Sequence, residues 1–205
     1  MTVIARSEPI DFYFDFSSPY GCFAAAQIED IATRHGRSVT WRPILLGAVF
    51  KVTNQQPLAT IPLKGDYMER DLERTARLLS LPFKRPSKFP ISTTAAARAF
   101  YAVVDKDQAL AKRLASALYA AYFSQDRDIS SPAVTLDVAA ELGIDREALE
   151  RALNDNAIKD RLRREVDAAI SRGVFGSPYI VIDGEPFWGS DRLDQVERWL
   201  STGGW

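Results

Sequence analysis

Strand-forming segments at the two ends of the chain enclose a long helical stretch, and this order limits the possible folds more than any other feature of the sequence. Residues 10–16 alternate in polarity and are rich in aromatic side chains, which predicts a β-strand. Ser18 and Pro19 follow as a helix-start signal, because serine caps free backbone amides and proline suits the first helical turn. We expect a helix over 19–34 and a second strand over 38–45.

The middle of the chain has a different pattern. A polar stretch with two prolines at 51–64 predicts a connecting loop. From 65 to 172, Ala, Leu, Arg and Glu recur at helical spacing, which predicts a series of helices. Strand signals return at 178–182 and 185–188, separated by the tight turn Asp183-Gly184.

The predicted order is therefore β-α-β, helices, β-β-α, with a last helix capped at 189–191 and running to Leu200. This is the order of an α/β thioredoxin-like fold with a helical domain inserted between its two halves. We expect residues 1–50 and 173–205 to form the thioredoxin-like domain and residues 65–172 the inserted helical domain.

Charge and cysteine content argue against several classes of protein. The chain has 26 Lys and Arg against 27 Asp and Glu, interspersed, so no basic surface for nucleic acid or anionic lipid is expected. Cys22 is the single cysteine and His35 the single histidine, so neither an internal disulfide nor a Cys/His zinc site is expected. The stretch 1–15 lacks the apolar core of a signal peptide, and no long apolar run predicts a membrane span. We expect a cytoplasmic protein without bound metal.

Ser18 is the main candidate for chemistry. Dithiol oxidoreductases of this fold carry C-x-x-C at the start of the first helix, where the helix dipole lowers a thiol pKa. The two positions are Ser18 and Gly21 here, and Cys22 lies one residue beyond, so thiol–disulfide exchange has no nucleophile. The thiol must then come from a ligand, for which glutathione is the obvious candidate. A hydrogen bond to a charged group contributes roughly 1.5–3 kcal/mol, or about one to two pKa units, so Ser18 could hold a bound thiol as thiolate. From these residues alone, a simple helix cap is an equally good interpretation of Ser18.

Four segments in order resemble one family. They are Asp15-Phe16-Ser17-Ser18-Pro19-Tyr20, Lys64-Gly65-Asp66-Tyr67-Met68, Phe175-Gly176-Ser177-Pro178 and Trp188-Gly189-Ser190-Asp191-Arg192. Together they are similar to the 2-hydroxychromene-2-carboxylate isomerase and kappa-class glutathione transferase family, whose members have a DsbA-like thioredoxin fold and use glutathione. The resemblance covers nearly the whole chain and implies a homodimer with Ser18 as the catalytic residue.

The resemblance also implies a set of binding residues. Ser177-Pro178 corresponds to a cis-proline loop, which turns the backbone of Ser177 toward a peptide-like ligand. Ser190 and Asp191 would hold the γ-glutamyl group of glutathione. Asn54 is assigned to glutathione binding, with Gln55 as an equal alternative. The residues expected to line the substrate pocket are Tyr20, Lys64, Tyr67 and Trp188.

The implied activity is glutathione-dependent isomerisation of 2-hydroxychromene-2-carboxylate or a related intermediate of aromatic degradation. Thiolate addition would turn a double bond into a single bond, and rotation and elimination would follow. Two alternatives remain open. A kappa-like transferase would use the same site and consume glutathione, whereas a non-catalytic protein would only bind it.

Overall fold

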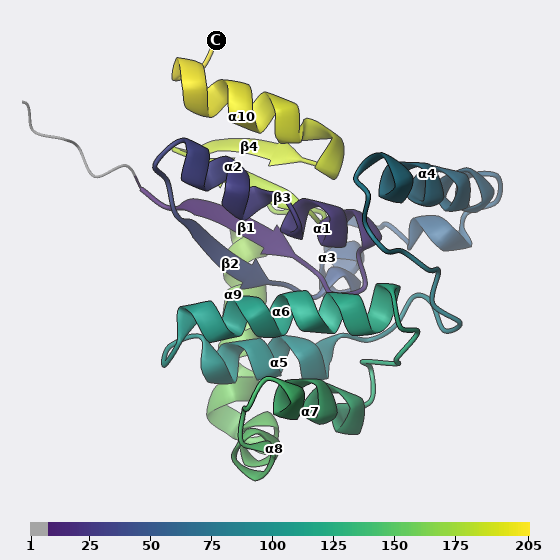
Figure 1. Cartoon of the computed structure of the whole chain (residues 1–205), viewed down its shortest axis with the longest axis vertical. Coiled ribbons are helices and arrows are strands. Elements are labelled where there is room, and N and C mark those ends of the chain that lie inside the picture. The colour runs from purple at the N-terminus through teal and green to yellow at the C-terminus, as the bar shows by residue number, and fades with distance from the viewer. Residues whose placement is uncertain (1–7) are drawn as a thin grey trace, which may run out of the picture.

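A four-stranded mixed β-sheet forms the centre of the computed structural model, which describes residues 8–205 (Figure 1). β1 (Ile10–Phe14) pairs in parallel with β2 (Val39–Pro43) and antiparallel with β3 (Tyr179–Ile182), and β3 pairs antiparallel with β4 (Glu185–Trp188). The sheet order β2-β1-β3-β4 confirms the predicted thioredoxin-like topology. The absence of a signal peptide was expected from residues 1–15, which lie partly outside the described residues.

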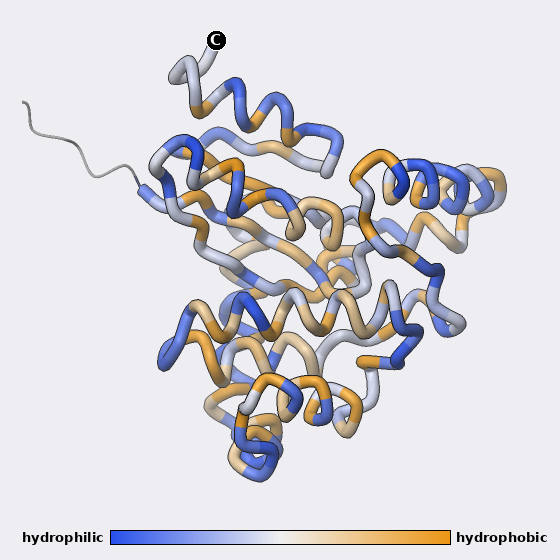
Figure 2. Tube along the Cα trace, in the orientation of Figure 1, coloured by the Kyte–Doolittle hydropathy of each residue, from blue (hydrophilic) through white to orange (hydrophobic). Residues whose placement is uncertain are grey.

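The strand side chains alternate between two apolar layers. Phe12 and Phe14 pack with Trp41 in the main core, whereas Tyr13 packs with Tyr179 in a second cluster. Figure 2 shows hydrophobic residues along the strands and at intervals along the covering helices. The main core continues without a break into the helices between β2 and β3. The sheet and the inserted helices therefore share one core.

The predicted helix over 19–34 is interrupted. α1 (Pro19–Ala25) and α2 (Ile28–Arg34) are separated by two residues. At Gln27 the backbone amide donates to Ala24 over 3.0 Å, and the side-chain amide donates to the carbonyl of Phe23 over 2.8 Å. In a continuous helix, the backbone amide of Gln27 would donate to the carbonyl of Phe23. Here the side chain of Gln27 binds that carbonyl instead, and the helix is interrupted.

The predicted loop at 51–64 is partly helical. α3 (Leu46–Thr53) extends into it, and a single 3-10 turn, η1 (Leu58–Thr60), follows. α3 starts where the Leu46 amide donates to the side chain of Asp15 over 2.6 Å, and it ends at Asn54, which adopts a left-handed conformation. Because Asp15 lies 31 positions before Leu46, the local sequence does not indicate that a helix starts here.

The helical stretch predicted over 65–172 is confirmed. It contains α4 (Lys64–Leu78), α5 (Thr94–Val103), α6 (Gln108–Phe123), α7 (Pro132–Glu141), α8 (Arg146–Asn154) and α9 (Asn156–Ser171). In Figure 1, α5 to α8 form one group below the sheet, and α4 stands apart from that group. The division of the chain into two domains at the expected boundaries stays a prediction.

The end of the chain differs from the prediction in one detail. Residues 189–191 were expected to cap the last helix, but Ser190–Arg192 forms a separate 3-10 turn, η2, and α10 (Leu193–Thr202) begins after it. In Figure 1, α10 lies next to β4, and Trp199 packs against Phe187 of that strand.

Candidate active site

A cavity of about 890 Å³ is the main candidate for a functional site. It is lined by the loop that carries Ser18, the first turn of α3, one side of α4, the loop before α5 and the segments 175–177 and 188–194. Segments from both ends of the chain and from the helical stretch thus meet at one cavity.

Ser18 lies at the start of α1 and is buried, with 5% of its surface exposed. Its hydroxyl donates to the carbonyl of Ser177 over 2.9 Å, and its oxygen accepts the amide of Gly21 over 3.0 Å. Ser18 therefore does cap α1, as the simpler interpretation expected. It also contacts the Ser177 loop, which a plain helix cap does not require.

The Ser177–Pro178 peptide bond is cis, as the resemblance implies. The Ser177 hydroxyl oxygen accepts the amide of Asp15 over 2.9 Å, which fixes this loop against the end of β1. The preceding Gly176 lies directly under the indole of Trp188, where an added Cβ would come within 2.2 Å of the ring nitrogen. Any larger residue at that position would require the indole to move.

Neither position near Ser18 can take over thiol chemistry. A Cβ added at Gly21 would lie 2.8 Å from both the Ser177 hydroxyl and the Tyr119 hydroxyl, so a second cysteine has no room there. Cys22 is half-buried, and burial raises the pKa of its thiol to about 12. Any reactive thiol at this site must therefore come from a ligand.

Asp15 is a buried carboxyl that the sequence analysis did not single out. Its side chain accepts hydrogen bonds from the amides of Ser17 (2.7 Å) and Leu46 (2.6 Å) and from the hydroxyl of Thr93 (3.0 Å). Burial raises the pKa of this carboxyl, and the three hydrogen bonds oppose the rise. Because these donors lie at the starts of α1, α3 and α5, Asp15 connects three helices beneath the cavity.

Tyr20 joins α1 to α4. Its hydroxyl donates to Asp71 over 2.8 Å, and Arg74 forms an ion pair with the same carboxylate. Burial and the Asp71 charge raise the pKa of Tyr20 well above its usual value. Tyr67 lies beside Arg74, and its side chain is 61% exposed at the edge of the cavity.

The structure separates the predicted binding residues into two groups. Those that line the cavity are Ser18, Tyr20, Tyr67, Ser177, Trp188, Ser190 and Asp191. Gln55 also lines it, whereas Asn54 does not, which favours the alternative assignment. Lys64 and Pro178 are likewise outside the lining, since Lys64 lies exposed at the start of α4 and Pro178 is buried beneath the loop. Asp191 forms an ion pair with Arg192 over 2.8 Å.

Three residues of this region gave no clear sequence signal. Asp15 follows a strand and begins the first family-like segment, so its position could have suggested a role. Asp71 lies within α4 and Thr93 directly before α5, and only the tertiary structure brings them to the site.

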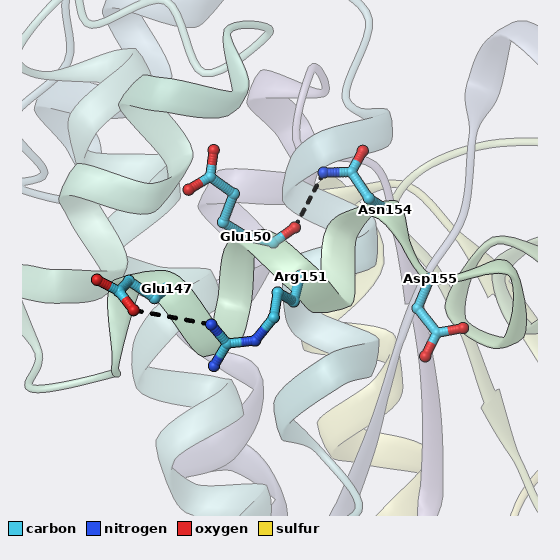
Figure 3. Close-up of a pocket in the computed structure, with 5 residues that line it drawn as sticks. All are labelled: Glu147, Glu150, Arg151, Asn154 and Asp155. Carbon is cyan, nitrogen blue, oxygen red and sulfur yellow. Dashed lines mark hydrogen bonds and ion pairs between the residues drawn. The ribbon is translucent and has the colours of Figure 1, made fainter.

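A second depression lies on α8 and is lined by Glu147, Glu150, Arg151, Asn154 and Asp155 (Figure 3). Within α8, Arg151 forms an ion pair with Glu147, and the Asn154 side chain donates to the carbonyl of Glu150. It is an open polar surface without a buried polar side chain, and we assign it no function.

Comparisons with known proteins agree with this architecture. Residues 9–201 match the model of the DSBA-like thioredoxin domain. A 2-hydroxychromene-2-carboxylate isomerase from Sphingobium xenophagum is 31% identical over 200 residues, covering 95% of this chain and 98% of that protein. The solved structure of an isomerase of this name superimposes with a TM-score of 0.85 at 28% identity, covering 94% of both chains. Glutathione S-transferase kappa 1 from Caenorhabditis elegans is 28% identical and covers 91% of this chain and 88% of the transferase.

The fold and the match over nearly the whole chain define the class: this chain belongs to the DSBA-like thioredoxin domain family. Within that family, it is similar to the 2-hydroxychromene-2-carboxylate isomerases and the kappa-class glutathione transferases, as the four segments implied.

Proposed function

We propose that this protein is a glutathione-dependent isomerase of 2-hydroxychromene-2-carboxylate or a related intermediate of aromatic degradation. The observation that carries the proposal is the position of Ser18. Its hydroxyl occupies the place of the nucleophilic sulfur in related dithiol enzymes and faces the Ser177 loop inside a large cavity. The relatives named as isomerases, at 30–32% identity, support this choice of reaction.

The donor set of the cavity suits glutathione. Ser18 offers a hydroxyl for a thiolate, and the backbone of Ser177 beside Pro178 offers groups for the peptide portion. Ser190 and Asp191 offer a hydroxyl for the γ-glutamyl carboxylate and a carboxylate for its ammonium group. Gln55 adds an amide at the cavity wall.

When bound, glutathione supplies a thiolate that adds reversibly to the conjugated carbonyl of the substrate, so that the former double bond can rotate. Ser18 holds the negative charge by donating its hydroxyl proton. Tyr20, Tyr67 and Trp188 present aromatic surface along the same cavity, which suits an aromatic substrate.

The test follows 2-hydroxychromene-2-carboxylate spectrally while free thiol is counted. An isomerase needs only trace glutathione and leaves it unconsumed over many turnovers. Absence of isomerisation at saturating glutathione would refute the proposal.

Kappa-like transferase activity is the second candidate, favoured by the similarity to kappa-class enzymes. In that case 1-chloro-2,4-dinitrobenzene would be conjugated with loss of one glutathione per product. A protein that only binds glutathione would do neither.

The cellular setting belongs to the same proposal. Among residues 8–205, no helix is long and apolar enough to span a bilayer. A cytoplasmic location, a homodimer and the lack of a nucleic acid partner stay predictions. Size-exclusion chromatography coupled to light scattering would test the dimer.

A further inference from the structure

Ser17, which directly precedes Ser18, places a second hydroxyl in the lining of the cavity. Its backbone amide donates to the Asp15 carboxyl over 2.7 Å, so its main chain is held in position. Its side-chain oxygen accepts the amide of Ile91 over 3.3 Å, and Ile91 lines the cavity as well. The half-buried Ser17 hydroxyl therefore has a fixed place in the cavity wall.

The proton of the Ser17 hydroxyl is available to a ligand. Within residues 8–205, no carbonyl or carboxylate oxygen accepts it, and the neighbouring acceptor is the phenol oxygen of Tyr122. Tyr122 donates its own proton to the carbonyl of Lys88 over 2.8 Å, so it keeps a hydrogen bond if Ser17 turns away. A neutral phenol oxygen is a weaker acceptor than an oxygen that carries negative charge. An anionic oxygen in the cavity would therefore attract the Ser17 proton, and no buried carbonyl would be left unpaired.

The proposed reaction creates such an oxygen. When a thiolate adds to the β-carbon of a conjugated carbonyl, the S–C bond forms and the π electrons of the C=C bond move onto the carbonyl oxygen, which becomes an enolate. After rotation the electrons return, the double bond forms again and the S–C bond breaks, so no proton is consumed. A donor aimed at this oxygen stabilises the enolate more than the substrate and lowers the barrier.

The two neighbouring serines have a suitable spacing for this step. In the adduct, four bonds separate the sulfur from the enolate oxygen, and the Cα atoms of adjacent residues lie about 3.8 Å apart. A sulfur at Ser18 therefore leaves the oxygen within reach of the Ser17 side chain. Phe89, Pro90 and Ile91 give the cavity apolar surface where the loop contacts Ser17, and such surroundings strengthen a hydrogen bond to a charged oxygen.

We propose that the Ser17 hydroxyl donates to the carbonyl oxygen of the substrate and stabilises the enolate, while Ser18 serves the sulfur. This inference rests on the proposed function and adds a second catalytic residue to it. It also restricts the substrates to electrophiles whose double bond is conjugated to a carbonyl group. A serine that only anchored the Ile91 loop would not act on the chemical step.

The first experiment compares the isomerisation kinetics of Ser17→Ala and Ser17→Thr. We expect the kcat of Ser17→Ala to fall roughly ten- to hundredfold, with unchanged glutathione affinity and unchanged pKa of the bound thiol, because Ser18 is intact. Ser17→Thr keeps a hydroxyl and should restore most of the activity. Thr75→Val is the matched control, because Thr75 presents a hydroxyl to the same cavity from α4, and it should match the wild type. A wild-type kcat in Ser17→Ala would overturn the inference.

The second experiment detects the hydrogen bond without turnover. The probe is trans-benzylidenepyruvate, an aromatic enone, bound together with S-methylglutathione, which has no free thiol to add. Donation to the ketone oxygen polarises the conjugated system, so the absorption band moves to longer wavelength and the ketone stretching frequency falls. We expect both shifts with the wild type and Ser17→Thr, and neither with Ser17→Ala.

The outcomes separate this inference from the proposed function. Equal shifts in all three proteins, no shift with the wild type, or no binding of the enone would overturn the role of Ser17 and leave the proposed isomerase standing. Absence of isomerisation by the wild type at saturating glutathione would overturn both.

Discussion

The hydroxyl of Thr93 donates to the Asp15 carboxyl over 3.0 Å inside the protein, and both side chains are almost fully buried. The other donors to this carboxyl are the amides of Ser17 and Leu46, and none of the three donors carries a charge. Neutral donors therefore hold this carboxyl, so its ionisation is linked directly to the stability of the fold.

Thr93→Val should lower the free energy of unfolding by about 1.5–3 kcal/mol near neutral pH, the usual contribution of a hydrogen bond to a charged group. Burial raises the pKa of Asp15, so the wild-type protein loses stability as pH rises from about 4 through the folded-state pKa. Removing a donor to the carboxylate raises that pKa further.

The destabilisation by Thr93→Val should therefore shrink toward about 1 kcal/mol as pH falls and the carboxyl becomes protonated. Urea unfolding at several pH values measures both effects. Thr94→Val is the control, because the Thr94 hydroxyl only faces Ser92 at the surface. A loss of stability that does not change with pH would contradict this role of Asp15.

Ser18→Ala should reduce isomerase turnover by about ten- to a hundredfold, because the hydroxyl contributes roughly one to two pKa units to thiolate stability. The KM for glutathione near neutral pH should change much less. Steady-state kinetics separates the two parameters. A turnover number that matches the wild type would show that the hydroxyl is not needed for the reaction.

Gln55→Ala should weaken glutathione binding several-fold, since Gln55 lines the cavity. Asn54→Ala should leave binding unchanged but cost about 1 kcal/mol of stability, because Asn54 holds a left-handed conformation with φ of 53°. Calorimetric binding and thermal unfolding of both variants test this pair. Weaker glutathione binding by Asn54→Ala together with unchanged binding by Gln55→Ala would instead assign the ligand contact to Asn54.

Cys22→Ala should keep isomerase activity within about twofold, because the thiol with its raised pKa stays protonated and unreactive. Wild-type protein should accordingly resist iodoacetamide under native conditions and show no insulin reductase activity. Rapid alkylation that inactivates the enzyme would contradict both expectations.

Gly21→Ala should destabilise the protein by about 1–3 kcal/mol, because the new methyl group would crowd Ser177 and Tyr119. Gly47→Ala is the matched control: nothing lies within 4 Å of the added methyl group in α3, and stability should rise slightly. Equal effects of the two substitutions would mean that the site relaxes easily around Gly21.

Much of the fold could be predicted because its signals are local. The aromatic alternation of β1 and the Asp183-Gly184 turn between β3 and β4 depend on neighbouring residues. α3 could not be predicted in the same way. Its sequence includes β-branched and aromatic residues, and its start depends on the distant carboxyl of Asp15.

The residues of the candidate site likewise separate into those with a local sequence signal and those that depend on distant contacts. Ser18 and the cis-proline loop stood out because short motifs carry them. Asp71, within α4, and Thr93, directly before α5, did not, because the local sequence of neither residue indicates its distant partner. Lys64 belongs to a family-like segment, yet it lies at the start of α4 outside the cavity lining, since helical geometry turns successive side chains in different directions.

Ser18 and Ser177 contact each other across 159 positions of the chain. During synthesis, Ser18 emerges from the ribosome long before the segment that supplies its carbonyl partner. A nascent chain that ends before Ser177 has the serine and most of the helices but lacks the loop that the serine hydroxyl contacts. The proposed glutathione binding should therefore report completed folding: in refolding experiments we expect it to appear with the last strands to pair, not with the first helices.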